Sequence, residues 1–108
     1  MLTFGLASVS TGKTLDETFE ILKSYAKQAK EAGCTALCFP ECFLTGYLPK
    51  KADAFSVSKD SHIFQEISNL SKSLDIDLLV GFMERTDKHF FITHGIFLAD
   101  GSASYYQK

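Results

Sequence analysis

The 108-residue sequence predicts an α/β fold, a mixed β-sheet with helices on one face, and three observations support this prediction. Short apolar segments alternate with amphipathic segments along residues 3–83, as in strand–helix–strand units. Two of the apolar segments show little alternation with polar residues, which is typical of strands covered on both faces in a parallel sheet. Near the end of the chain, Asp100-Gly101 separates two further segments and predicts an antiparallel hairpin.

The first strand is expected at residues 3–9, followed by a polar loop at residues 10–13. A helix is predicted next because Thr14 and Glu17 have the spacing of a capping box, in which the threonine hydroxyl accepts a hydrogen bond from the glutamate N–H. The apolar stripe of this helix recurs at steps of three and four and comprises Leu15, Phe19, Leu22, Ala26 and Ala29. Gly33 is expected to end the helix.

A second apolar strand at residues 34–39 completes a right-handed βαβ unit. Residues 42–60 contain Gly46 and Pro49 and predict a long loop. A second helix, capped by Asp60 or Ser61, has an apolar stripe formed by Phe64, Ile67, Leu70 and Leu74. A buried strand at residues 76–83 follows, and antiparallel strands are expected at residues 89–100 and 103–108. We expect one incomplete domain over residues 1–108, because the sequence stops within a strand.

Composition excludes several classes of function. A hydrophobic content of 45% indicates a globular domain. The net charge is −2 and the longest basic cluster is Lys50-Lys51, so a nucleic-acid partner is not expected. No apolar run reaches the length of a membrane span, so no membrane is expected as a partner. The N-terminus lacks the basic segment of a secretory signal and the three cysteines cannot all pair, so we expect a cytoplasmic protein.

Glu41 is the strongest candidate catalytic residue. It follows Pro40 directly after a buried strand, and the carboxyl ends of strands in α/β folds are where reactive groups gather. On position alone, the favoured interpretation of Glu41 is an ordinary loop or capping carboxylate, because strand ends often carry one.

Several short motifs occur together, in order, along the whole chain: Ala36-Leu37-Cys38-Phe39-Pro40-Glu41, Thr45-Gly46-Tyr47, Leu78 to Arg85, and Tyr106-Gln107-Lys108. With the first strand and its capped helix, this combination resembles the nitrilase superfamily of carbon-nitrogen hydrolases. The resemblance implies that the chain is the N-terminal part of an α-β-β-α sandwich. It also implies a hydrolase that acts on small amides or nitriles, without metal or cofactor, as a homo-oligomer.

The resemblance further implies a Glu-Lys-Cys triad in which Glu41 and Lys108 match the glutamate and the lysine, while the cysteine lies beyond residue 108. Glu41 would accept the thiol proton, a role that a buried glutamate with a raised pKa can fill near neutral pH. Lys108 would stabilise the negative charge that develops on the substrate. Tyr47 would line the substrate pocket. Without the resemblance, Lys108 is an exposed lysine on an edge strand and Tyr47 a packing residue of the loop.

Two other function classes remain open. Gly12-Lys13-Thr14, between a strand and a helix, resembles the end of a nucleotide-binding P-loop, although Ala7 replaces the first glycine of that motif. A non-catalytic interaction module is the other alternative. Cys34, Cys38 and Cys42 are spaced by four, as metal ligands on a helix can be, but Pro40 interrupts any such helix, so we interpret them as small buried apolar residues.

Overall fold

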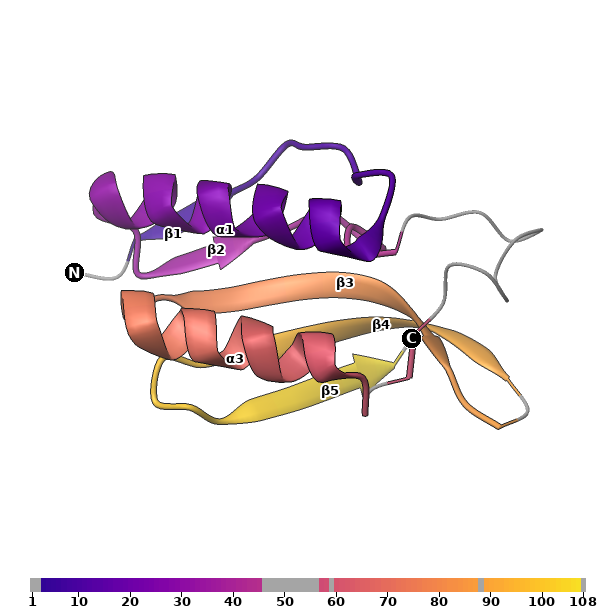
Figure 1. Ribbon diagram of the computed structural model, residues 1–108. Helices are drawn as coiled ribbons and strands as arrows, with labels where there is room; N and C mark the ends of the chain where they lie inside the picture. The colour runs from indigo at the N-terminus through magenta and orange to yellow at the C-terminus, as the bar shows by residue number, and fades with distance from the viewer. Residues whose placement is uncertain (1–2, 46–56, 59, 88, 108) are drawn as a thin grey trace.

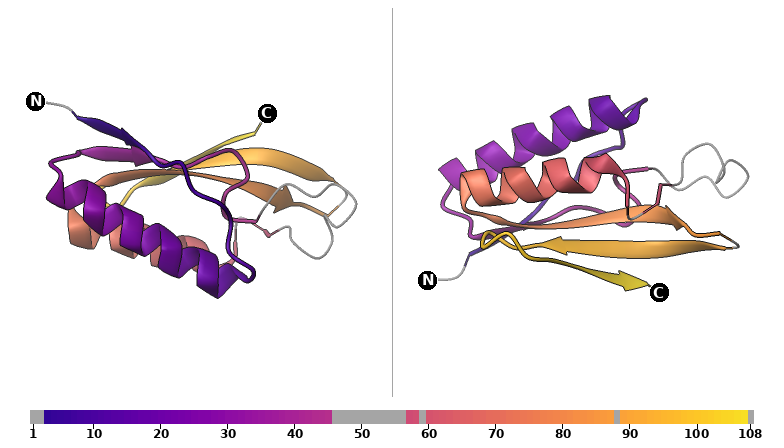
Figure 2. Two further views of the ribbon diagram at one scale, coloured as in Figure 1. Left: turned by 90° about the horizontal axis from the view of Figure 1, so that it is seen from above. Right: turned by 60° about the horizontal axis from the view of Figure 1, so that its bottom comes forward.

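A computed structural model describes residues 3–45, 57–58, 60–87 and 89–107 of the chain. The elements in chain order are β1 (Phe4–Leu6), α1 (Leu15–Glu31), β2 (Ala36–Cys38), α3 (His62–Leu74), β3 (Asp77–Arg85), β4 (Phe90–Phe97) and β5 (Ala103–Gln107). The strands form one sheet in the order β1-β2-β3-β4-β5 (Figure 1). Both helices lie on one face of this sheet (Figure 2), which confirms the predicted α/β architecture.

The sheet is mixed, as predicted. β1 pairs with β2, and β2 with β3, in parallel, whereas β4 is antiparallel to both β3 and β5. The directions of β2, β3 and β5 therefore agree, and their carboxyl ends lie at the same edge of the sheet (Figure 1). The hairpin at Asp100-Gly101 also forms, with the N–H of Gly101 donating to the carbonyl of Leu98 at 3.0 Å.

β1 is shorter than the predicted strand at residues 3–9, because its partner strand ends early. β2 stops at Cys38, whose carbonyl accepts a last hydrogen bond from the N–H of Ala7 at 2.9 Å. Two residues further on, Pro40 has no N–H to offer to a ladder. The chain after Ala7 therefore leaves the sheet and crosses to the start of α1.

Helix α1 begins as the capping box predicts. The Thr14 hydroxyl accepts a hydrogen bond from the N–H of Glu17 at 3.0 Å, and Gly33 follows the helix with φ +90°, a conformation that favours glycine. The structure adds Thr18, which is fully buried. Its hydroxyl donates to the Thr14 carbonyl at 3.0 Å and accepts from the N–H of Gly12 at 2.9 Å, so it fixes the loop that precedes the helix.

Thr14→Ala in the full-length protein should lower the free energy of unfolding by about 1 kcal/mol, because the first turn of α1 loses its side-chain cap. Thr14→Ser keeps the hydroxyl and should retain most of the stability. Urea denaturation followed by circular dichroism measures both variants. If serine were as destabilising as alanine, the hydroxyl would not be the stabilising group.

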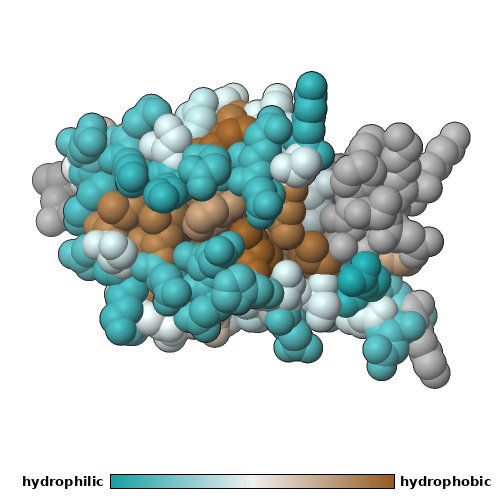
Figure 3. Space-filling view, in the orientation of Figure 1, coloured by the Kyte–Doolittle hydropathy of each residue, from teal (hydrophilic) through white to brown (hydrophobic). Residues whose placement is uncertain are grey.

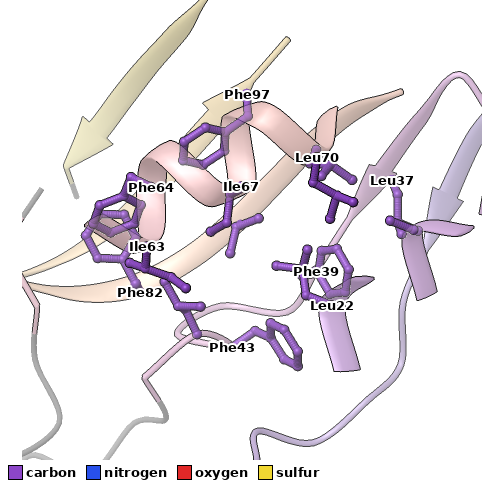
Figure 4. Packing of buried hydrophobic residues seen from close by; sticks show 14 of the residues in the cluster. Leu22, Leu37, Phe39, Phe43, Ile63, Phe64, Ile67, Leu70, Phe82 and Phe97 are labelled. Atoms are coloured by element: carbon purple, nitrogen blue, oxygen red, sulfur yellow. The ribbon is translucent and has the colours of Figure 1, made fainter. Parts of the chain in front are cut away.

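The core lies between the sheet and both helices. The buried side chains of α3 that point toward the strands are Ile63, Phe64, Ile67 and Leu70 (Figure 4). The ring of Phe64 lies 4.6 Å from that of Phe82 and 6.1 Å from that of Phe97, centroid to centroid. Ser71 ties the helix to the sheet, because its buried hydroxyl is within 3.0 Å of the Phe97 carbonyl and 2.6 Å of the Ile76 carbonyl. Ser61, not Asp60, is the N-cap residue of α3.

The two faces of this two-layer arrangement differ. On the helical face, an apolar band runs along the seam between α1 and α3, with polar side chains on both sides of it (Figure 3). On the face opposite the helices, Phe4, Leu6 and Tyr106 are 63%, 83% and 67% exposed. Large exposed apolar side chains on a sheet face are what a second layer covers in a sandwich.

Candidate active site

Glu41 lies in a turn at residues 41–45 that continues from the carboxyl end of β2 along the neighbouring strand β3. The N–H of Phe39 donates to the Leu79 carbonyl at 2.9 Å, and the N–H of Leu44 donates to the Gly81 carbonyl at 2.9 Å. The turn therefore takes the place of β2 beside β3 and keeps a fixed position on the sheet.

Local sequence explains why the chain turns here. Pro40 has no N–H for the ladder, so β2 ends. The Pro40 carbonyl then accepts a hydrogen bond from the N–H of Phe43 at 3.1 Å, and this bond closes the turn. The Phe43 ring stacks on that of Phe39 at 4.8 Å between centroids. Cys42 is buried and has φ +56°, a left-handed conformation that is uncommon for any residue other than glycine. Such strain persists only where surrounding contacts hold it.

Glu41 itself is exposed, while the residues on either side of it, Pro40 and Cys42, are partly and fully buried. The turn is thus anchored by its apolar residues, while Glu41 is its exposed residue. The chemistry implied for Glu41 needs a carboxylate shielded from water, and the part of the chain that the structure describes does not provide that shield.

The other two predicted site residues, Tyr47 and Lys108, lie outside the described residues. The residue before Lys108 is described, because Gln107 ends β5. β2 and β5 run in the same direction, so their carboxyl ends lie at the same edge of the sheet. Glu41 comes shortly after the end of β2, and Gln107 is the last residue of β5. In α/β folds this edge is where ligands bind.

A buried carboxylate that the sequence did not single out, that of Glu84 on β3, lies at this edge. Glu84 is 1% exposed, and its Oε1 accepts hydrogen bonds from the Thr93 hydroxyl at 2.8 Å and from Nε2 of Gln107 at 2.9 Å. Burial raises the pKa of Tyr105, and the negative charges of Glu84 and Asp60 raise it further. The sequence contained a signal for this burial, because Glu84 has the strand parity of Leu78, Val80 and Phe82.

Next to Glu84, the surface has a shallow hollow of about 500 Å³. It is lined by Ser58, Asp60, Glu84, Arg85, Thr86 and Asp87. Sequence reasoning also gave no role to Gly81, on which the Glu41 turn packs, or to Thr45, the residue that ends the turn and binds the N–H of Met83. An isolated glycine inside a strand is a known signal of close backbone approach.

The residues that suggested a P-loop have other roles here. The Thr14 hydroxyl caps α1, and the N–H of Gly12 is bound to Thr18, so two groups of the motif are engaged within the chain. No disulfide joins the three cysteines, all of which lie in the described part of the chain. Within the described ranges no three histidine, cysteine or acidic side chains form a group that could hold a metal ion, and no helix there has the length and apolarity needed to cross a membrane.

Comparison with known proteins matches residues 5–108 to a protein family described as carbon-nitrogen hydrolase. The chain is also 29% identical over 102 residues to an arylacetonitrilase from Macrophomina phaseolina (strain MS6), an alignment that spans 82% of this chain and 28% of the relative.

Solved structures of an amidase from Nesterenkonia sp. AN1 share the fold. The first, a cysteine-to-alanine mutant in complex with butyramide, is 19% identical with a TM-score of 0.81, and the match covers 99% of this chain and 42% of the amidase. The second, a glutamate-to-glutamine mutant, shows covalent addition of the acetamide moiety of fluoroacetamide at the active-site cysteine. It is 18% identical with a TM-score of 0.83, at the same coverages of 99% and 42%. The chain thus spans less than half the length of these relatives.

Proposed function

Because this chain belongs to the carbon-nitrogen hydrolase family, we propose that the full-length protein hydrolyses non-peptide carbon-nitrogen bonds through a Glu-Lys-Cys triad. The proposal rests mainly on one observation. The turn that presents Glu41 lies within the family match, at the carboxyl end of a parallel strand, and is held against β3 by backbone hydrogen bonds. A general base must keep its position relative to the nucleophile, and this turn is built to hold one carboxylate in place.

In the proposed reaction, Glu41 takes the proton from a cysteine thiol that lies beyond residue 108. The thiolate attacks the carbon of the substrate. With an amide, the nitrogen takes the proton held by Glu41 and leaves as ammonia or an amine; with a nitrile, a thioimidate forms first and one water adds to it before ammonia leaves. A water molecule then cleaves the resulting thioester to the carboxylic acid and the free thiol. The covalent addition seen at the active-site cysteine of the Nesterenkonia amidase supports a cysteine nucleophile in this fold. Exposure of Glu41 in the described residues agrees with a site that is completed by a further part of the protein.

Lys108 is proposed to stabilise the negative charge that forms on the substrate oxygen or nitrogen. This proposal is supported by the end of β5, which is held in place because the Gln107 side chain donates a hydrogen bond to buried Glu84. Tyr47 is proposed to line the pocket. Neither metal nor cofactor enters the proposed reaction.

The substrate is proposed to be a small amide or nitrile. The name of the arylacetonitrilase suggests the nitrile class, and the amidase bound to butyramide suggests the amide class. We further propose a cytoplasmic homo-oligomer. Two edge strands, β1 and β5, end the described sheet, and unpaired edges favour association with other chains.

The test is hydrolysis by the full-length protein of two substrates, butyramide and phenylacetonitrile, measured as ammonia release. We expect turnover of at least one, together with a mass increase on one cysteine when the reaction is stopped early. The coding sequence beyond Lys108 should place that cysteine after an apolar strand, at the start of a helix.

Other outcomes identify the alternatives. ATP or GTP binding that is lost in Lys13→Ala, without hydrolysis, would indicate a nucleotide-binding protein. The absence of both activities would indicate an interaction module. The family match supports a hydrolase and gives neither alternative support.

A further inference from the structure

We propose that Gly81 and Thr45 are positioning residues for Glu41. Gly81 allows the turn to lie directly on β3, and Thr45 fixes the far end of the turn to the same strand. This inference rests on the proposed function, because it concerns the placement of the proposed general base.

The turn approaches Gly81 more closely than any side chain at that position would permit. A Cβ atom built on Gly81 would lie 2.7 Å from the backbone nitrogen of Cys42, 3.0 Å from the carbonyl oxygen of Pro40 and 3.0 Å from Cε1 of His94. The two backbone atoms belong to the residues that flank Glu41. Any substitution at Gly81 therefore pushes directly on the segment that presents the carboxylate.

Several contacts restrict how the backbone of the turn can move in response to this clash. The Leu44 N–H is bound to the carbonyl of Gly81 itself, so displacement of the turn strains this bond. Cys42 already has the unfavourable φ of +56°, and its buried side chain limits rotation. The Thr11 hydroxyl, in the loop before α1, donates to the Phe43 carbonyl at 2.8 Å. Because hydrogen bonds hold Phe43 and Leu44, we expect the clash at Gly81 to displace residues 40–42, which include Glu41.

Thr45 holds the other end. It is buried at 6% exposure, and its hydroxyl oxygen accepts a hydrogen bond from the N–H of Met83 at 2.8 Å. The Thr45 side chain thus adds a hydrogen bond to β3 beyond those that the N–H groups of Phe39 and Leu44 donate to the same strand. Loss of the hydroxyl leaves a buried N–H on β3 without this partner, which is costly, and releases the end of the turn.

The first experiment compares Gly81→Ala with Gly95→Ala in the full-length protein. A Cβ at Gly95, in β4, would lie 2.6 Å from the Phe97 ring, so the control is also crowded but presses on a side chain and not on the backbone of the Glu41 turn. Misplacement of a catalytic group by about 1 Å can cost 10²-fold, so Gly81→Ala should lower kcat by about 10- to 100-fold with KM nearly unchanged. Gly95→Ala should leave kcat within about twofold, because the added Cβ displaces the Phe97 ring and its nearest neighbours include no atom of the Glu41 turn.

A double-mutant cycle separates positioning from general damage. In a Glu41→Gln background the base is already lost, so adding Gly81→Ala should change the residual kcat by less than about threefold. An equal loss of activity in both backgrounds would overturn the proposal, because the substitution would then act without Glu41.

If Gly81→Ala does not fold, Thr45 provides the test. Thr45→Val should lower kcat about tenfold or more, whereas Thr45→Ser, which keeps the hydroxyl, should restore most of the activity. Equal activity of the valine and serine variants would overturn the proposal. A wild-type protein that hydrolyses neither butyramide nor phenylacetonitrile would contradict the proposed function instead, so the two failures are distinguishable.

Discussion

Glu41→Gln in the full-length protein is expected to lower kcat by about 10²- to 10⁴-fold, the usual contribution of a general base. The amide has the size and shape of the carboxylate but cannot accept the proton of the attacking thiol. Because Glu41 is exposed and the turn is anchored by Pro40, Cys42 and Phe43, the substitution should change the free energy of unfolding by less than about 0.5 kcal/mol. Ammonia release and urea denaturation measure the two effects.

The matched control is Glu31→Gln, which makes the same chemical change at an exposed carboxylate in the last turn of α1. It should retain kcat within about twofold, as expected for a surface change away from the site. If Glu41→Gln were as active as this control, Glu41 would not be the base. A variant that lost activity only together with its folded structure would show that the carboxylate is structural.

The fold could be predicted where local sequence and the final packing agree. The capping box at Thr14, the apolar stripe of α1 and the glycine after it all predict the same helix, and the structure contains it. The hairpin at Asp100-Gly101 was equally local. The extent of β1 could not be predicted, because it depends on where the neighbouring strand ends, and this is a property of pairing between distant segments.

The candidate site could likewise be predicted only where local sequence determines the structure. Pro40 marks the end of β2, so the position of Glu41 at the carboxyl end of a strand followed from the sequence. The strand parity of Glu84 and the isolated glycine at position 81 indicate burial and close approach, but the groups that meet them depend on the register between β3 and its neighbours, which no local pattern specifies. Pairing of β4 with β3 on one side and with β5 on the other places Thr93 and Gln107 beside Glu84.

The largest loss of stability is expected from Phe82→Ala. Phe82 is fully buried on β3, between Gly81 and Met83, and its ring lies 4.6 Å from that of Phe64 and 6.2 Å from that of Tyr105. Removing the ring loses buried apolar area and leaves a cavity under α3, which typically costs about 3–5 kcal/mol. Urea denaturation of the full-length protein measures the change.

Phe90→Ala is the control, because it removes the same ring from a strand position that is 44% exposed. We expect a loss of less than about 1 kcal/mol there, since much less area leaves water. Similar losses for both variants would contradict a core centred on the contact between α3 and β3.

Phe82 follows Gly81 in the strand that supports the Glu41 turn. We expect Phe82→Ala to lower kcat only under conditions where part of the protein is unfolded. A fall in kcat at full folding would show that the core packing beneath β3 helps to hold the Glu41 turn in place.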